Sequence, residues 1–558
     1  MKSGLKRKYL NWLLLCLIIC LGAGLRFYNA GEEPLWFDEM GTWDTARGDM
    51  RMVKSPMNLF SFDKIPVQPG SRINRLQNVI RNTKADSIHM PLYFICVYLV
   101  KSSLGDSALA LRLLSIIPGI LSILIIYLLA NFFFKDFTAL LSAAFMALLW
   151  FPIYYSREAR MYSLMILCSL WSTYMAVRFY ASVKQDQPRY RFLLFFYVTS
   201  LFNAYLHFAT LYYTGLQSVV FFIFLFLHWR KSRPQVKKLI LLGIIQLIAL
   251  IPAIYYILSV MLRITDVPNI QWLKKPGLEN FLLFFNTFLN YPDDPMLGNY
   301  ARIVSQSPLV RNFIVSLCLV AAVIGYDRYI IKHGSTRALL RTSIRYRKKE
   351  LLLLGWLFVP VILQFIISLV LVPAYMDRYL VYALPPLYIL LARCICSITR
   401  KRWLNIIMLV LFTGLALYDL VSAKDLYTGA HKMQFKEALS MIADNKSRYA
   451  KAVLASDQGS FGIEYYINKY GLDSLPLLTL QKDYPETFPR QMDWQAYPEQ
   501  ARREAAAFLK YQQTAGYLWY ITINYDGVVK DLNYQGLEML DSFYFYKVMV
   551  MLYKFVPF

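Results

Sequence analysis

Charged residues are scarce in this sequence. Asp, Glu, Lys and Arg make up 17% of its 558 residues, whereas a soluble globular protein carries about 25%. We also find no internal repeat and no low-complexity tract, which argues against a repeat architecture or a disordered chain. The low charge is hard to reconcile with a soluble protein of this length.

Cysteine is infrequent as well. All seven copies lie in or beside long apolar segments, and none falls in the more polar C-terminal part. No disulfide framework is therefore expected. The pair Cys394 and Cys396 has neither metal-ligand spacing nor partner histidines, so it predicts no metal site.

Long apolar blocks are what the chain has in abundance. It is 57% hydrophobic and 16% aromatic, and several blocks are about long enough to cross a ~30 Å hydrocarbon layer. So many blocks cannot all be core helices of one soluble domain, and we predict a multi-pass membrane protein. The clearest are Leu10–Leu25, Leu111–Phe134, Leu239–Val260, Asn312–Tyr326, Leu351–Val372 and Trp403–Leu420.

The net charge of +25 does not indicate a nucleic-acid-binding protein. The basic residues form short clusters between apolar blocks, as the positive-inside rule predicts for cytoplasmic loops. If the cluster Lys2–Lys8 is cytoplasmic and each block crosses once, every dense basic cluster falls on one side. This gives eleven helices, an uncleaved first helix, a cytoplasmic N-terminus and an external C-terminus.

The first external loop spans about residues 28–90, and Pro91–Lys101 is too short to cross, so we predict an interfacial helix there. The third crossing is predicted over Ala139–Pro152. We divide the chain into a membrane domain, 1–422, and an extracytoplasmic α/β domain, 423–558. The second domain is expected to alternate helices and strands: helices at 436–444, 461–470 and 499–511, and strands at 452–455, 517–523 and 543–553.

An acidic pair lies just beyond the first helix. Asp38 and Glu39 end the stretch Pro-Leu-Trp-Phe-Asp-Glu at 34–39. Deprotonating an acceptor hydroxyl requires a carboxylate held where acceptor and donor meet. Asp38 is therefore the candidate general base, with Glu39 as an orienting group. Spacing alone also fits two solvated loop acids.

Polar residues at the outer ends of later helices form a second set of candidates. Arg112, near the start of the second crossing, requires a partner: either a lipid phosphate, which a guanidinium binds in bidentate fashion, or a carboxylate of the external loop. His89 either contacts substrate or orders the loop.

The run Ser156–Tyr162 opens the fourth crossing. Arg157 and Arg160 are three residues apart and would share a helical face, for phosphate binding or for anchoring a loop. Glu158 points elsewhere, where it would pair with Arg112 or another cation.

Arg378 and Tyr379 lie at the outer mouth of the tenth crossing. Three distant regions thus supply cations on one side, which suits a leaving group that gains negative charge. Headgroup anchoring is the alternative for any single arginine. No ligand cluster in the sequence requires a metal ion. Whether a divalent ion shares the role of binding phosphate is left open.

Taken together, these segments resemble the bacterial glycosyltransferase-39-like family, which includes protein O-mannosyltransferases and the aminoarabinose transferase of lipid A. The resemblance runs in order over about Leu10–Leu390, and only the whole set of motifs makes it specific. The motifs are PLWFDE, HMPLYF, ALRLLSIIPGILSILIIYLLA, SREARMYSL and DRYLVYALPPL.

The resemblance implies a GT-C membrane fold, an external active site and a polyprenyl-phosphate sugar donor in the bacterial inner membrane. It also implies that Asp38, with Glu39, is the catalytic acid motif. Arg112, Arg160 and Arg378 would contact the donor phosphate, as would Arg157. His89, Glu158 and Tyr379 would contact substrate, although the usual His-Pro-Pro-Leu is His-Met-Pro-Leu here.

The implied reaction is a displacement with inversion onto a protein, lipid or glycan acceptor. Two other classes share some of these features. A lipid-linked oligosaccharide ligase or polymerase would use a diphosphate donor and does not predict the early Asp-Glu pair. A flippase or transporter is expected to have polar residues near mid-membrane or paired broken helices, whereas here they cluster at the outer ends.

Overall fold

The structure is a computed structural model. It describes residues 2–54, 62–67, 71–86, 89–134, 137–227, 229–261, 275–289, 309–333, 348–371, 375–399, 401–423, 426–427, 432–456, 463–480, 499–523, 532, 536–545 and 547–556. Most of the second expected external loop, 262–311, and the basic residues at 337–347 lie outside these ranges.

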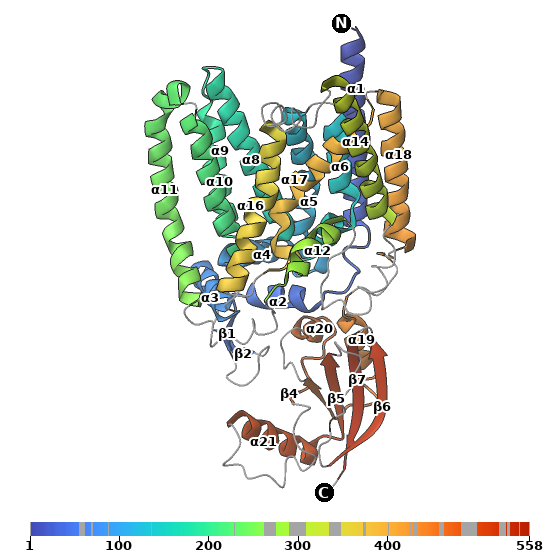
Figure 1. The fold of residues 1–558 in the computed structure, drawn as a ribbon. Coiled ribbons are helices and arrows are strands. Elements are labelled where there is room, and N and C mark those ends of the chain that lie inside the picture. The colour runs from blue at the N-terminus through green and yellow to red at the C-terminus, as the bar shows by residue number, and fades with distance from the viewer. Residues whose placement is uncertain are drawn as a thin grey trace.

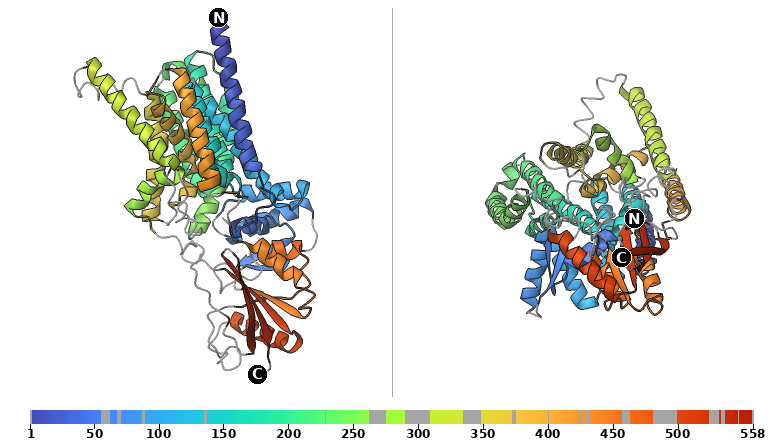
Figure 2. Two further views of the ribbon diagram at one scale, coloured as in Figure 1. Left: turned by 90° about the vertical axis from the view of Figure 1, so that its right-hand side faces the viewer. Right: turned by 90° about the horizontal axis from the view of Figure 1, so that it is seen from below.

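A bundle of helices forms the larger part of the molecule, and a small sheet with its helices extends from one end (Figure 1). The N-terminus lies at the opposite end of the bundle (Figure 2). Helices α5, α6, α8 and α17 pack together in the bundle core. The bundle helices are α1 (Lys2–Phe27), α5 (Ala108–Phe133), α6 (Phe137–Leu148), α7 (Trp150–Ser156), α8 (Tyr162–Lys184), α9 (Tyr190–Ala204), α10 (Phe208–Leu227), α11 (Trp229–Met261), α12 (Leu278–Leu289), α14 (Leu309–His333), α16 (Lys348–Val370), α17 (Leu384–Ile395) and α18 (Arg402–Tyr418).

The expected membrane character is confirmed. Among the described residues, six helices are long and apolar enough to span a membrane, or seven if the bent pair α6–α7 is one span. Each of the eleven expected crossings contains a helix. Several of these helices are shorter than a full membrane span, so the count of eleven stays a prediction. Large apolar side chains on α1, α11 and α16 are exposed, as expected for helices that face lipid.

The third crossing is not one straight helix. α6 ends at Leu148, and α7 begins at Trp150 at an angle of 53°. Pro152 explains the break, because a proline ring clashes with the carbonyl four residues earlier, here that of Leu148. Arg26 from α1 then donates to the carbonyls of Met146 and Ala147, at 2.8 and 3.0 Å, which the break deprives of helical partners.

The described part of the loop that is predicted to be external lies between the bundle and the C-terminal sheet (Figure 1). It contains α2 (Phe37–Thr45), a two-stranded antiparallel sheet of β1 (Met50–Lys54) and β2 (Phe62–Pro66), and α3 (Arg72–Asp86). α4 (Pro91–Leu104) follows, with Pro91 in its first turn, where the missing N–H costs nothing. At 14 residues it is too short to span.

The C-terminal part has the expected α/β character. Its five-stranded sheet has the order β4-β3-β5-β7-β6, with β3 parallel to β4 and β5, and β7 antiparallel to β5 and β6. The boundary at residue 422 stays a prediction. The elements are α19 (Phe435–Asp444), β3 (Ala452–Ser456), α20 (Glu464–Lys469), β4 (Leu477–Thr479), α21 (Glu499–Thr514), β5 (Tyr517–Ile523), β6 (Leu537–Phe545) and β7 (Val548–Phe555).

One expectation for this part is wrong, and one strand was missed. The single strand predicted over 543–553 is a hairpin, which turns at Lys547, whose φ of 56° lies in the left-handed region. Continuous apolar alternation through β6 and β7 conceals this turn, since the sequence has no Asn-Gly or Asp-Gly signal there. The three-residue strand β4 was not predicted, because it is too short to show a period.

Candidate active site

The acidic pair of the external loop lies in the first turn of α2. Trp36 is the N-cap residue, and the Oε2 atom of Glu39 accepts from the Trp36 N–H at 3.4 Å. Carboxylates here also interact favourably with the positive end of the helix dipole. Because successive helical residues point about 100° apart, Asp38 and Glu39 face different surroundings.

Glu39 faces inward and is fully buried. Arg112 of α5 donates to both of its carboxylate oxygens, at 2.8 and 2.7 Å, and the backbone N–H of Ala159 donates to Oε1 at 2.8 Å. Burial alone would raise the pKa of Glu39, but the charges of Arg112 and Lys432 and these hydrogen bonds lower it to about 2. Glu39 is therefore ionised at neutral pH.

Arg112 is saturated by protein acceptors. Beyond its two bonds to Glu39, it donates to the carbonyls of Ala30, Glu33 and Pro34, at 2.7 to 2.9 Å. These five bonds equal the five N–H donors of a guanidinium. No donor is left for a lipid phosphate, so the structure favours the alternative role, a structural ion pair that anchors the external loop on α5.

Asp38 faces the bundle end, where two other arginines converge. Its Oδ2 atom lies 3.3 Å from Nη1 of Arg378 and 3.8 Å from Nη2 of Arg160. Arg378 is held in a 3₁₀ turn, Asp377–Tyr379, that is tied to α12 by a 2.6 Å bond from Thr287 to Asp377. The Asp38 side chain keeps 15% exposure, whereas both arginines are buried.

His89 holds Arg160 in place. The Nη2 atom of Arg160 lies 2.7 Å from Nε2 of His89. Since arginine only donates, this ring nitrogen is the acceptor and the imidazole proton sits on Nδ1. His89 therefore contacts the cation that faces Asp38, which is compatible with the loop-ordering role that the sequence left open.

The segment between α7 and α8 differs from its prediction. Residues 157–161 are not helical, because α7 ends at Ser156, so Arg157 and Arg160 do not share a helical face. Arg157 donates to the Tyr28 and Leu25 carbonyls and lies 3.2 Å from Glu33. These contacts fit the loop-anchoring role for Arg157, away from Asp38.

Glu158 is buried beside Tyr154 and the Lys432 ammonium, with 1% exposure. Burial raises the pKa of this carboxyl to about 8, although Lys432 acts in the opposite direction. Glu158 is thus largely protonated at neutral pH and can donate a hydrogen bond.

Lys432 is a residue of this site that the sequence did not reveal. It precedes α19, and its Nζ atom lies 3.2 Å from Oε2 of Glu39 and donates to the Arg157 carbonyl at 3.1 Å. It is 4% exposed. No sequence signal distinguishes it from other basic residues, yet it ties the C-terminal part to the acid motif 393 residues earlier.

Replacing Lys432 by Met is expected to destabilise the chain. Glu39 would keep Arg112, so the cost should stay below the about 3–5 kcal/mol of breaking an isolated buried pair. The matched control is Lys436→Met, which removes an exposed pair with Glu32 worth about 0–1 kcal/mol. Thermal unfolding of both purified variants measures the difference; equal unfolding temperatures would contradict the structural role of Lys432.

His207, between α9 and α10, is a second residue that the sequence did not reveal. It is fully buried, and its ring centroid lies 4.6 Å from that of Tyr379 and 6.3 Å from that of His89. Its Nδ1 accepts from the Ala209 N–H at 3.2 Å, so the proton sits on Nε2, which has no hydrogen-bond partner among the described residues. Burial and nearby cations lower its pKa well below the usual value, so it is a neutral donor.

The site thus has two layers. Asp38, Arg160, Arg378, His89, Tyr379 and His207 lie together at the bundle end, while Glu39, Arg112, Arg157, Glu158 and Lys432 form a network beside them. In the part of the chain that the structure describes, no group of three or more His, Cys, Asp or Glu side chains is placed to hold a metal ion.

Residues 88–256 match the model of the dolichyl-phosphate-mannose-protein mannosyltransferase family. This segment includes His89, Arg112 and Arg160, whereas Asp38 and Arg378 lie outside it. No curated protein sequence is significantly similar to the chain.

Among solved structures, the chain is similar to ArnT from Cupriavidus metallidurans, in the apo state, with 11% identity over 98% of each chain and a TM-score of 0.48. The same protein bound to undecaprenyl phosphate matches with 12% identity over 97% of this chain and 98% of that chain, at a TM-score of 0.47. An oligosaccharyltransferase from Archaeoglobus fulgidus matches with 11% identity over 92% of this chain and 69% of that chain, at a TM-score of 0.46. The protein is therefore a multi-pass membrane protein that resembles the dolichyl-phosphate-mannose-protein mannosyltransferase family over residues 88–256, as its motifs predicted.

Proposed function

We propose that the protein is an inverting glycosyltransferase that moves a sugar from a polyprenyl-monophosphate donor to an acceptor on the non-cytoplasmic face. One observation carries this proposal. The Asp38 carboxylate lies within 4 Å of two guanidinium groups, those of Arg160 and Arg378, which come from segments far apart in the sequence. A base beside a pair of cations is what transfer from a phosphate ester requires.

In the proposed reaction, Asp38 takes the proton of the acceptor hydroxyl. The acceptor oxygen forms a bond to the anomeric carbon from the face opposite the phosphate, and the bond between that carbon and the phosphate oxygen breaks. The electron pair leaves with the polyprenyl phosphate. Arg160 and Arg378 stabilise the charge that develops on this leaving group.

Without a donor, Asp38 is the anion that these two arginines contact. The donor phosphodiester carries one negative charge, as a carboxylate does, but it accepts bidentate bonds from arginine and gains charge as the glycosidic bond breaks. It would therefore compete for the same cations and release Asp38 to act as a base. The Nε2–H of His207 is a further donor beside this place. It would bond a phosphate or sugar oxygen without adding charge.

The proposed side of the membrane follows from the two ends of the bundle. The basic N-terminus lies at one end, and α2 and the C-terminal sheet lie at the other (Figure 1). Asp38 belongs to α2, and Arg378 contacts it at 3.3 Å. If the basic N-terminus is cytoplasmic, Asp38 and Arg378 face the opposite compartment together. Cysteine labelling that placed them on opposite sides would end the proposal.

Arg378→Ala is expected to weaken use of the donor more than use of the acceptor. The guanidinium contacts Asp38 in the structure and would contact the phosphate in the proposed complex. The KM for the donor should therefore rise at least tenfold, and the KM for the acceptor should change less. Steady-state transfer with each substrate varied measures this. The control is Arg311→Ala, which removes an arginine bonded to Asn286; equal effects of Arg378→Ala on both substrates would indicate a structural role.

Transfer of radiolabelled sugar from a polyprenyl monophosphate by the purified protein tests the proposed function itself. A ligase or polymerase would require the diphosphate donor, and a flippase would move the lipid without forming a product. Parallel reactions with EDTA and with added divalent ions determine whether a metal shares the phosphate charge.

A further inference from the structure

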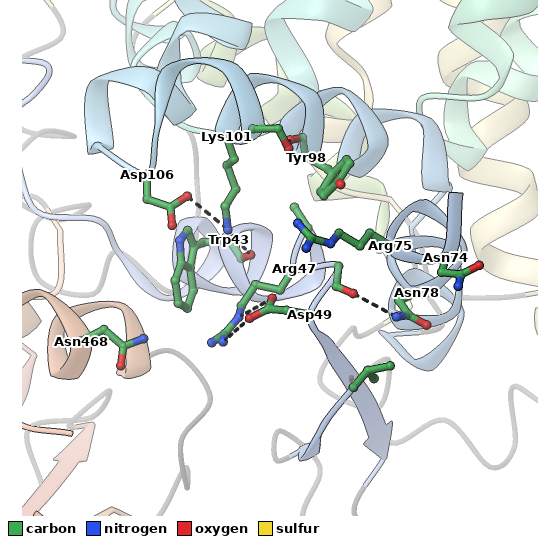
Figure 3. A pocket seen from close by; sticks show the side chains of 14 residues that line it. Trp43, Arg47, Asp49, Asn74, Arg75, Asn78, Tyr98, Lys101, Asp106 and Asn468 are labelled. Carbon is green, nitrogen blue, oxygen red and sulfur yellow. Dashed lines mark hydrogen bonds and ion pairs between the residues drawn. The ribbon is translucent and has the colours of Figure 1, made fainter. Parts of the chain in front are cut away.

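A second site lies at the far end of α2 from Asp38. Here a pocket of about 420 Å³ opens between the C-terminal end of α2, the turn 46–49 that leads to β1, α3, α4 and α20 (Figure 3). The external loop, the interfacial helix and the C-terminal part therefore all contribute side chains to it. Asn468 of α20 is the contribution of the C-terminal part.

The lining carries charges of both signs, and two of its three cations, Arg47 and Lys101, are already paired. Arg47 contacts Asp49 at 3.0 Å and also Glu464 of α20, and Lys101 contacts Asp106 at 3.4 Å. A pocket for a free phosphate would present several cations without such acids, whereas among the described lining residues Arg75 alone is a cation without an ion pair. A pocket for a lipid tail would be lined by apolar side chains, whereas this one is mostly polar.

The other lining groups suit a ligand rich in hydroxyls. Asn74 and Asn468 are exposed amides, each able to donate and accept. Trp43 is 5% exposed, and its indole N–H has no hydrogen-bond partner among the described residues. Tyr98 adds a second ring.

The rings and cations of this pocket also hold one another in place. The Arg47 and Lys101 cations lie 4.9 and 4.5 Å from the Trp43 ring centroid. Gly48 allows α3 to approach closely, because a Cβ there would lie 2.6 Å from the Cβ of Arg75. These contacts preorganise the pocket, so a ligand does not need to order its side chains. The entropic cost of binding is therefore lower.

The pocket and the proposed base are joined by one short helix. Trp43 follows Asp38 by five residues, which is about 7.5 Å along the axis of α2. We propose that this pocket binds an uncharged saccharide part of the acceptor, so that the acceptor is a glycan with a nearby hydroxyl at Asp38. This inference rests on the proposed function for its link to Asp38, and it gives the C-terminal part a role in acceptor recognition.

Direct binding tests the pocket without any transfer reaction. Saturation-transfer NMR on the full-length protein in nanodiscs would use maltotriose, chitotriose and mannotriose in turn. At least one is expected to give a saturable signal that millimolar inorganic phosphate does not displace. Failure of all three to bind, or displacement by phosphate, would overturn the proposal.

A matched pair of substitutions locates the binding. Ser102 and Ser103 are adjacent exposed residues of α4, and only Ser102 lines the pocket. Ser102→Trp fills the pocket and is expected to weaken trisaccharide binding at least tenfold, whereas Ser103→Trp leaves it unchanged. Equal binding by both variants would place the sugar elsewhere and overturn the proposal.

The two proposals fail separately. If the monophosphate donor gives no transfer while Ser102→Trp still abolishes trisaccharide binding, the proposed reaction is wrong and the saccharide pocket stands. If transfer to a glycan occurs and Ser102→Trp leaves its acceptor KM unchanged, the reaction stands and the pocket proposal is wrong.

Discussion

Asp38→Asn is expected to slow sugar transfer by roughly 10²- to 10⁴-fold, the usual contribution of a general acid or base. The amide keeps the size of the carboxylate but cannot take the acceptor proton. It also removes the anion that contacts Arg160 and Arg378, so the variant should bind polyprenyl phosphate at least as tightly as the wild type. Single-turnover transfer and equilibrium binding of the lipid measure the two effects.

The control for this variant is Glu32→Gln, which neutralises an exposed acid of the same loop, 78% exposed and paired with Lys436. Its transfer rate should match the wild type. Near-normal transfer by Asp38→Asn would remove Asp38 from the mechanism. A parallel loss of lipid binding would mean that Asp38 supports the site instead of acting as its base.

Glu39→Gln is expected to lower the stability of the folded chain by about 3–5 kcal/mol, the cost of leaving a buried charge without its partner. The substitution preserves shape but leaves the fully buried guanidinium of Arg112 with no close full charge to face, since Glu33 is 3.8 Å away and shared with Arg157. A neutral amide also cannot accept all the bonds that the carboxylate accepts from Arg112, Ala159 and Lys432.

Thermal unfolding and the yield of membrane-inserted protein measure this loss, and Asp38→Asn provides the comparison. Asp38 is 15% exposed and contacts its arginines at 3.3 and 3.8 Å, without the bidentate bonds that Glu39 accepts, so its loss should cost less stability than the loss of Glu39. The two neighbouring acids thus separate activity from stability. A Glu39→Gln protein that is as stable as the wild type but inactive would instead place Glu39 in the chemistry.

The sequence was informative wherever the signal is local. Apolar length predicted the membrane character, and the α/β alternation after residue 422 predicted the C-terminal part. The acid motif was recognisable because Asp38 and Glu39 are adjacent and follow a helix end. Pro91 predicted the start of α4 for the same reason, since its missing N–H is tolerated only at a helix start.

The sequence was uninformative wherever the direction of a side chain depends on residues that are far away along the chain. Arg157 and Arg160 were expected on one helical face, but the chain between α7 and α8 is not helical and they point to different partners. Lys432 and His207 carry no motif. They enter the site only because α19 and the α9–α10 turn pack against the bundle end.

What the sequence by itself determined is therefore the membrane location, the order of helices and the presence of an acid pair with arginines at helix ends, because hydrophobic length and residue type act locally. Only the tertiary structure decided which acid faces which cation. All five N–H donors of Arg112 are bonded to Glu39 and three carbonyls, while Arg160 and Arg378 contact Asp38. Buried charges must be paired within a few ångströms, and that pairing depends on how segments hundreds of residues apart pack.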